Sequence, residues 1–249
     1  MKKIVLIIAF CLLIVGCGQK PEEKNDFDAK TAYLSASESM KDVSAIDLTM
    51  IISMNIEGSD AFEMIDDIET RMQMIYDEDF TKIKAGFSTS MQGYSMDYYL
   101  DEGYIYIDMF GVKMKQKVDA SDIDMFETSE ASGTIIDNDK ILDLLKYEKQ
   151  GDNTVFTLEL KSEEEIKLAL GSVDNGTLQE LEAIGITYER ILVKMVTNKD
   201  SEIIEYVMDM DIYSEEENQR GSVKLEMKIN AYGDAVVIDF PDFSGYTEQ

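Results

Sequence analysis

Residues 45–56 of this 249-residue chain, AIDLTMIISMNI, carry the clearest structural pattern in the sequence. Apolar side chains occupy every second position along it: Ile46, Leu48, Met50, Ile52, Met54 and Ile56. Successive side chains of a β-strand point to opposite faces of a sheet, so this period of two predicts one long strand with a single buried face. Gly58-Ser59-Asp60 follows, and residues of these types favour a turn, which predicts that the strand ends there.

The same alternation recurs along the chain and predicts an antiparallel sheet. Turn-forming residues such as Asp101-Glu102-Gly103 and Phe110-Gly111 separate the next strands, which together with the strand 45–56 form a meander of about six. Three long strands close the chain, and Asn198-Lys199-Asp200 predicts a hairpin between the first two. The strands expected after residues 45–56 are 71–77, 82–91, 96–100, 104–109, 112–118, 156–160, 191–195, 206–212, 223–229 and a short final strand at 234–240.

Periods closer to 3.6 residues predict several helices among these strands. Asp137 or Asn138 is the expected N-cap of one of them. Ser162 and Glu165 predict a capping box at the start of another, in which each side chain bonds the backbone N–H of the other residue. The expected helices are 28–41, 120–127, 138–147, the one that begins at Ser162, and 177–184.

Strands of this length twist and coil, so a large antiparallel sheet built from them curls. We therefore expect an α+β fold with a large curved antiparallel sheet, a half-open barrel of about ten or eleven strands. Covering helices at 120–147 and 162–184 are expected on its concave side. An outer-membrane barrel is the competing interpretation, but the chain lacks the aromatic girdles of such barrels. No Pro-rich, Ser-rich or Gly-rich linker divides residues 29–249, which predicts a single domain there.

The N-terminus predicts export. Lys2 and Lys3 precede an uninterrupted apolar run, residues 4–15. Twelve residues span about 18 Å as a helix, well short of the roughly 30 Å hydrocarbon core, so the run is typical of a signal peptide and not of a permanent transmembrane helix. Ile14-Val15-Gly16-Cys17 ends the run and resembles the lipobox of bacterial lipoproteins. An ordinary signal peptide with an incidental cysteine is the alternative.

The lipobox resemblance implies that Cys17 is lipidated. In such lipoproteins the cysteine sulfur takes a diacylglyceryl group and a dedicated peptidase cuts after the preceding residue, here Gly16, so that Cys17 becomes the N-terminus. We therefore expect a signal peptide at 1–16 and a lipidated polar tether at 17–28. Two or more acyl chains hold a protein stably on a membrane, so the membrane is an expected partner. Because the signal peptide predicts export, the expected location is the extracytoplasmic face of a cell membrane.

The composition excludes several classes of enzyme. Histidine is absent, and the two cysteines, Cys11 and Cys17, leave the mature domain without a free thiol. The usual general base, a disulfide, a cysteine-ligated zinc site and thiol catalysis are therefore missing. Acidic residues number 51, but no pair of carboxylates stands out as catalytic, and neither Asp122 nor Asp209 begins an EF-hand loop. We predict no enzymatic activity, no cofactor and no metal.

The charge of the chain is strongly acidic. Its 51 acidic and 23 basic residues give a formal charge of −28, and loss of Lys2 and Lys3 with the signal takes this to −30. Such a protein repels nucleic acid and anionic headgroups, so we expect neither as an electrostatic partner. A solvated, soluble outer face is the ordinary explanation of this charge.

The order of elements resembles the superfamily of the LolA and LolB lipoprotein carriers and the mycobacterial LppX and LprG lipoproteins, and more closely their uncharacterised Gram-positive relatives. The residues that carry the resemblance are the tyrosine-rich hairpin MDYYLDEGYIY at 96–106, Lys113-Met114-Lys115, and the closing stretch 230–241. Such families commonly place a tryptophan beside the lysine of that triplet, and this chain has none. The resemblance spans residues 29–245.

The resemblance implies an apolar ligand, because members with known roles hold acyl chains between a curved sheet and covering helices. The inward face is then the ligand wall, with these candidates: Leu48, Met50, Ile52, Met72, Met74, Tyr98, Met208, Met210 and Met227. The mature chain keeps fifteen of the sixteen methionines, and their flexible side chains suit varied apolar shapes. They suit an ordinary packed core equally well, and the sequence leaves both possibilities open.

Two functional hypotheses follow. The first is a membrane-anchored extracytoplasmic lipoprotein that binds an apolar ligand such as a lipid or acyl chain. The alternative is a non-catalytic interaction or scaffold lipoprotein with a packed core and an acidic surface. A cavity of about 300 Å³ or more on the inward face favours the first.

Overall fold

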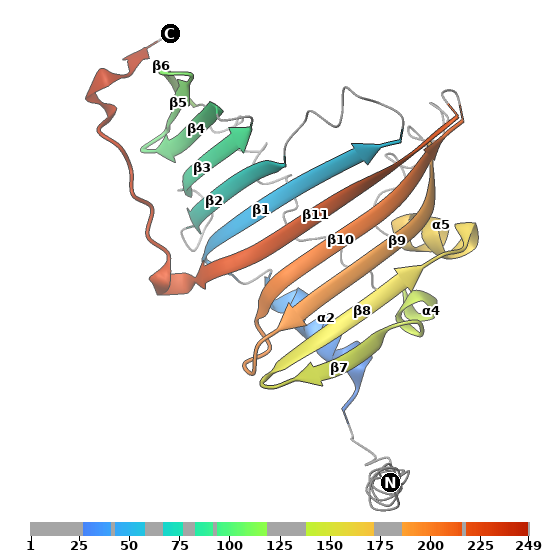
Figure 1. Cartoon of the computed structure of the whole chain (residues 1–249). Helices are drawn as coiled ribbons and strands as arrows, with labels where there is room; N and C mark the ends of the chain where they lie inside the picture. Colours follow the sequence, from blue (N-terminus) through green and yellow to red (C-terminus); the bar gives the residue numbers. More distant parts are fainter. Residues whose placement is uncertain are drawn as a thin grey trace, which may run out of the picture.

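A computed structural model of the chain describes residues 27–40, 43–57, 67–76, 83–91, 94–118, 138–171, 186–215 and 218–248. Their strands form one twelve-stranded sheet in the order β12-β6-β5-β4-β3-β2-β1-β11-β10-β9-β8-β7 (Figure 1). The sheet is open, because β12 and β7 lie at opposite ends of this order. The expected large curved antiparallel sheet with few helices is confirmed, with twelve described strands where the sequence predicts ten or eleven.

Two meanders, together with the short edge strand β12 (Thr247–Glu248), make up the sheet, and the meanders meet at its centre. The first contains β1 (Ala45–Ile56), β2 (Ile68–Tyr76), β3 (Ile83–Met91), β4 (Tyr94–Asp101), β5 (Tyr104–Met109) and β6 (Val112–Lys117). The second contains β7 (Lys146–Gln150), β8 (Asn153–Leu160), β9 (Ile186–Thr197), β10 (Ile203–Ser214) and β11 (Gln219–Tyr232). β11 pairs antiparallel with β1, with Met50 opposite Met227. This central ladder joins the two halves into one sheet.

The tight turns predicted in the first meander are confirmed. Glu102 and Gly103 have φ angles of 50° and 77°, and Phe110 and Gly111 have 55° and 81°. Positive φ at both central residues is typical of type I′ hairpin turns, whose twist matches that of the flanking strands. Glycine adopts this conformation without the steric cost that a side chain brings, which explains its place in both turns.

The described helices cover one face of the sheet, here called the inner face. They are α2 (Ala29–Ser39), α4 (Asp139–Leu142) and α5 (Glu163–Gly171), and α2 passes behind the second meander in Figure 1. Asn138 caps α4 as predicted, since its side chain accepts a hydrogen bond from the backbone N–H of Lys140. The predicted capping box of α5 is also present: Ser162 Oγ accepts from the Glu165 N–H at 3.2 Å, and Glu165 Oε2 accepts from the Ser162 N–H at 3.1 Å.

Two apolar clusters lie on the inner face. The larger one lies between the helices and β8–β10, and its buried members are Tyr33, Ala36, Ile141, Leu142, Phe156, Leu158, Leu160, Ile166, Ala169, Ile191, Val193, Met195, Ile203 and Tyr206. The smaller one lies on the first meander and β11, and its buried members are Ile46, Leu48, Met74, Ala85, Leu100, Val118 and Ile229. The hydrophobic core is therefore divided between the two halves of the sheet.

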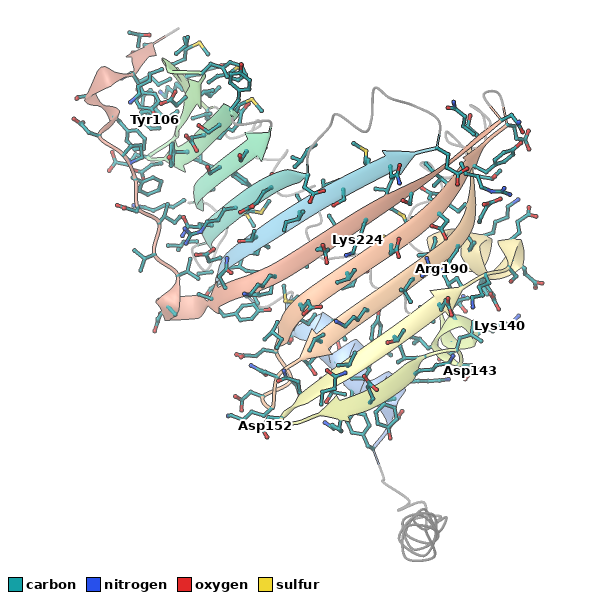
Figure 2. All side chains as sticks on the ribbon, viewed as in Figure 1. Tyr106, Lys140, Asp143, Asp152, Arg190 and Lys224 are labelled. Atoms are coloured by element: carbon teal, nitrogen blue, oxygen red, sulfur yellow. The ribbon has the colours of Figure 1, made fainter. Side chains whose placement is uncertain are left out.

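On the opposite, outer face the second meander carries many charged side chains, and Figure 2 shows Arg190 and Lys224 there. The Arg190 guanidinium lies 3.3 Å from Glu159, 3.4 Å from Asp209 and 3.3 Å from Asp211. Half-exposed pairs of this kind add little stability individually. They do place a cation among carboxylates that would otherwise repel one another.

The C-terminal segment 233–248, here called the strap, crosses the outer face of the first meander. It contains η2 (Gly233–Ala235), η3 (Phe243–Gly245) and β12 (Thr247–Glu248), and β12 pairs in parallel with β6. The Phe243 ring stacks on Tyr106 with centroids 3.7 Å apart. Gly86 makes room for the strap, because a Cβ there would lie 3.3 Å from Cγ2 of Ile238.

Two predicted elements are wrong. Residues 138–147 form the short helix α4 followed by the start of β7, not one helix, and residues 234–240 belong to the strap, not to a final strand. The helices predicted at 120–127 and 177–184 lie outside the described residues. Within the described part of the chain, no helix is both long and apolar enough to cross a bilayer.

Candidate apolar ligand site

All nine predicted wall residues lie on the inner face of the sheet. The strand pairing sets them in rows that cross several strands, since residues directly opposite each other in a ladder share a face. The rows are Tyr98–Phe87–Met72–Leu48, Ile52–Leu225–Met208, Met50–Met227 and Met74–Ile46, and Met210 lies two residues beyond Met208 on the same face. Gly16 and Cys17 lie outside the described residues.

The nine residues differ in how deeply they are buried. Leu48 and Met74 are 5% and 7% exposed and belong to the smaller apolar cluster. The other seven are half-buried. The inner face therefore combines a packed core with an apolar surface that the rest of the protein covers only in part.

A pocket of about 280 Å³ opens on the inner face of the first meander. Its lining residues are Thr70, Phe87, Thr89, Tyr98, Tyr99, Leu100 and Ile105, from β2, β3, β4 and β5. Most of this lining is apolar. The hydroxyls of Thr70 and Thr89 lie 3.1 Å apart and hydrogen-bond to each other, so they present little unsatisfied polarity to a ligand. The arrangement suits an aliphatic or aromatic group rather than a charged one.

Tyr98 is the single predicted wall residue that lines this pocket. Thr70 and Thr89 are not predicted from the sequence, because the predicted wall contains apolar positions and these two are polar members of the same alternation. The ladder pairs Thr70 with Thr89 directly, but that register becomes known only when the strand pairing is known. The apolar alternation of β3 and β5 was the available signal for Phe87 and Ile105.

A buried carboxylate network lies on the outer face at the central seam. Asp47 accepts hydrogen bonds from Arg71 Nη2 at 2.7 Å, Gln73 Nε2 at 3.0 Å and Asn230 Nδ2 at 3.0 Å. Burial alone raises the pKa of the Asp47 carboxyl, but these three donors together lower it below its ordinary value. Gln73 Nε2 also donates to the Val237 carbonyl at 2.8 Å, which ties the strap to the network.

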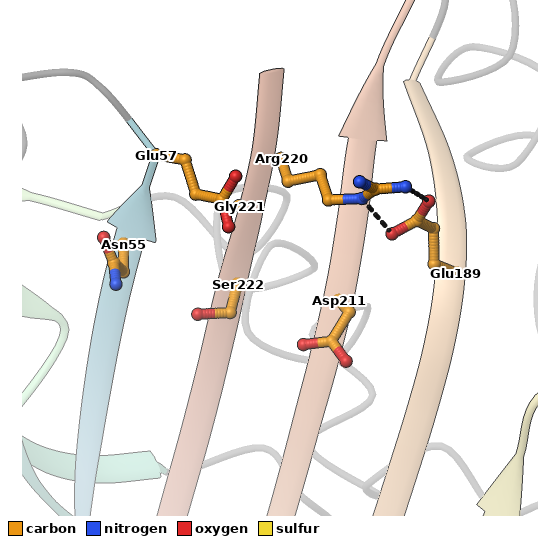
Figure 3. A pocket seen from close by; sticks show the side chains of 7 residues that line it. All are labelled: Asn55, Glu57, Glu189, Asp211, Arg220, Gly221 and Ser222. Atoms are coloured by element: carbon orange, nitrogen blue, oxygen red, sulfur yellow. Dashed lines mark hydrogen bonds and ion pairs between the residues drawn. The ribbon is translucent and has the colours of Figure 1, made fainter. Parts of the chain in front are cut away.

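A second, polar pocket of about 260 Å³ lies at the end of the central strands (Figure 3). It is lined by Asn55, Glu57, Glu189, Asp211, Arg220, Gly221 and Ser222. Arg220 forms a bidentate ion pair within the pocket, because both its Nε and its Nη2 donate to the Glu189 carboxylate at 2.9 Å. The described residues include no group of three or more side chains placed to hold a metal ion.

The chain matches no protein-family model and no curated protein. Among solved structures it is similar to a DUF1329 family protein from Desulfovibrio piger, with 11% identity over 85% of this chain and 96% of that one and a TM-score of 0.27. It is also similar to a β-barrel-like DUF1849 protein from Brucella abortus, with 8% identity over 76% and 100% of the two chains and a TM-score of 0.21. TM-scores this low carry no argument about function, so the resemblance to LolA and LppX stays a prediction.

Proposed function

We propose that this protein is an extracytoplasmic lipoprotein that binds an apolar ligand, such as a lipid or acyl chain, on the inner face of its sheet. The observation that carries the proposal is the 280 Å³ pocket beside a half-buried apolar surface. At about 280 Å³ the pocket is slightly smaller than the roughly 300 Å³ at which pockets for small ligands begin, so it holds only part of a chain. The remainder of an extended ligand lies along the adjoining half-buried face.

Burial of apolar surface is the main source of affinity for such a ligand. Each methylene group buried contributes about 0.8 kcal/mol, and an acyl chain brings many of them. Half-buried methionines such as Met50, Met208 and Met227 can change rotamer to follow the chain at little cost. The activity proposed is binding and not catalysis, because the chain has no histidine and the mature domain no free cysteine thiol.

The first test is native mass spectrometry with lipid extraction, together with binding of a fluorescent palmitate analogue. Thr89→Phe adds a large side chain to the pocket, whereas Ser88→Phe adds the same side chain to the outer face of the same strand. We expect at least about tenfold weaker binding for Thr89→Phe and unchanged binding for Ser88→Phe. A wild-type protein that carries no lipid and does not bind the probe contradicts the proposal and favours the alternative, a non-catalytic scaffold lipoprotein.

The lipid anchor at Cys17 is the second part of the proposal. It rests on the sequence Ile14-Val15-Gly16-Cys17 after the apolar run. The anchor holds the domain at the membrane, where lipid ligands are present. Radiolabelled palmitate is expected to enter the wild type and not a Cys17→Ser variant, and equal labelling of both contradicts this part of the proposal.

A further inference from the structure

Tyr206 lies on the apolar inner face of β10, in the second meander. On β10 it stands opposite Met195 of β9 and opposite Met227 of β11. It is 6% exposed and belongs to the larger apolar cluster, together with Tyr33 of α2. Its phenol group is therefore surrounded mainly by aliphatic side chains and thioethers.

The Tyr206 hydroxyl is buried and has no hydrogen-bond partner among the described residues. Asp101 Oδ1 also lacks a hydrogen bond, but it lies 3.2 Å from the Lys84 ammonium. By contrast, the half-buried Tyr232 donates its hydroxyl proton to the Ile203 carbonyl and lies 3.3 Å from Met40 Sδ. The fold thus satisfies one tyrosine of this region and leaves the other unpaired.

An unpaired buried hydroxyl costs free energy, because it gives up its hydrogen bonds to water and gains none. A phenylalanine fills the same volume without that cost. Burial, and after it the neighbouring Tyr33, raises the pKa of the Tyr206 phenol, so the group stays protonated and able to donate. The hydroxyl is therefore a donor that lacks an acceptor.

We infer that the Tyr206 hydroxyl is the group that binds the polar end of the apolar ligand and so selects an acyl chain with a hydrogen-bond acceptor. The inference rests on the proposed function and adds to it the group that recognises the polar end of the ligand. Half-buried Met208 and Met227 adjoin Tyr206, and Met50 lies beside Met227. Because the hydroxyl itself is buried, one end of a chain lying along this surface reaches it when the flexible side chain of Met208 or Met227 changes rotamer.

The surroundings favour a neutral acceptor, such as an ester or amide carbonyl, over an ionised carboxylate. Among the described inner-face positions of β1, β9, β10 and β11, none in register with the Tyr206 region carries a charge. A buried carboxylate without a counter-charge is costly, whereas a carbonyl needs only the one donor.

The test uses the full chain, purified from membranes and exchanged into a short-chain detergent. The probes are 1-palmitoylglycerol, labelled with ¹³C at its ester carbonyl, and the matched hexadecyl ether of glycerol, which lacks that carbonyl. Tyr206→Phe removes the hydroxyl alone and is expected to weaken ester binding by about three- to tenfold while leaving ether binding unchanged. The ester carbonyl stretch should shift to lower frequency on the wild type and not on Tyr206→Phe.

The control is Tyr232→Phe, which removes a hydroxyl that already has a protein partner. This variant is expected to lose thermal stability and keep the preference for the ester, whereas Tyr206→Phe keeps or gains stability. If the wild type binds both probes and Tyr206→Phe binds the ester equally well, this inference is overturned and the proposed function stands. If the wild type binds neither probe, both are overturned.

Discussion

Truncation of Phe243 to alanine is expected to release the strap from the outer face. Phe243 stacks on Tyr106 at 3.7 Å between centroids with an interplanar angle of 11°. Its ring also contacts Tyr99 at 5.8 Å, Phe240 at 5.8 Å and Tyr246 at 5.5 Å. It is thus the one ring that touches each of the other four, and its loss removes the centre of the group.

The magnitude follows from these contacts. A fully buried phenylalanine costs about 3–5 kcal/mol when it is truncated to alanine, and an aromatic pair contributes about 0.5–1.5 kcal/mol beyond its burial. Phe243 is half-buried, so a loss of about 2–3 kcal/mol is expected in the docking of the strap. This corresponds to a roughly 30- to 150-fold increase in the equilibrium constant for strap opening.

Hydrogen exchange followed by mass spectrometry measures that opening directly. Peptides from the strap and from β4–β6 should exchange faster in Phe243→Ala by the stated factor, while β8–β10 keep their protection. Burial raises the pKa of Tyr246 to about 12, and release of the strap should return it toward its ordinary value of 10.0. Phe110→Ala is the matched control, since Phe110 is 63% exposed and contacts only Tyr94 among the described rings. Unchanged protection of the strap, or an equal effect of both variants, refutes the reasoning.

Three further predictions concern other parts of the chain. Asp47→Asn should lower the free energy of unfolding by about 1–2 kcal/mol at pH 7, measured by urea unfolding. Because the pKa of Asp47 is depressed in the folded state, the greater stability of the wild type is present above the unfolded-state pKa and disappears as the pH falls through the folded-state pKa. A difference in stability that stays constant down to pH 2 contradicts this prediction. Leu158→Ala, at a site with 0% exposure, should cost about 2–5 kcal/mol, and a loss below about 1 kcal/mol is the contrary outcome. Ser162→Ala should cost about 1 kcal/mol and increase exchange within α5 alone.

Period-two alternation predicted most of the sheet, because each long strand buries one face whatever its partner is. The pattern gave wrong predictions where a strand is exposed on both faces, and where apolar residues pack on the outer face without belonging to a strand. β7 (Lys146–Gln150) is exposed along its whole length, so no apolar alternation marks it, and Leu144 and Leu145 extended the helical pattern over it. Residues 234–240 alternate like a strand, but Gly233, with a φ of 56°, turns the chain out of β11 and onto the outer face. There Val236 is buried without a ladder.

For the predicted wall residues too, the local sequence predicts one property and the tertiary structure determines another. The alternation of each strand decides which face a side chain occupies, and all nine predicted residues share the inner face. How deeply each is buried depends on the pairing of β1 with β11 and on the helices, which no single strand encodes. Leu48 therefore lies in the core while Tyr98 lines a pocket. Tyr206 has the same alternation as Met208, and only the packing reveals its unpaired hydroxyl.

The two halves of the sheet are stabilised from opposite sides, and this explains how an open apolar pocket is compatible with a stable fold. The second meander is covered on its inner face by α2, α4 and α5, which fill the space above β8–β10. The first meander is also held on its outer face, where the strap packs on Tyr99 and Tyr106. Tyr99 also lines the pocket, together with its β4 neighbours Tyr98 and Leu100. Strands that are packed against the strap on the outer face need fewer contacts on the inner face. The strap therefore supplies stability that the inner face, with its open pocket, does not. It follows that variants which loosen the strap should weaken the proposed ligand binding, although the substituted residues of the strap do not line the pocket.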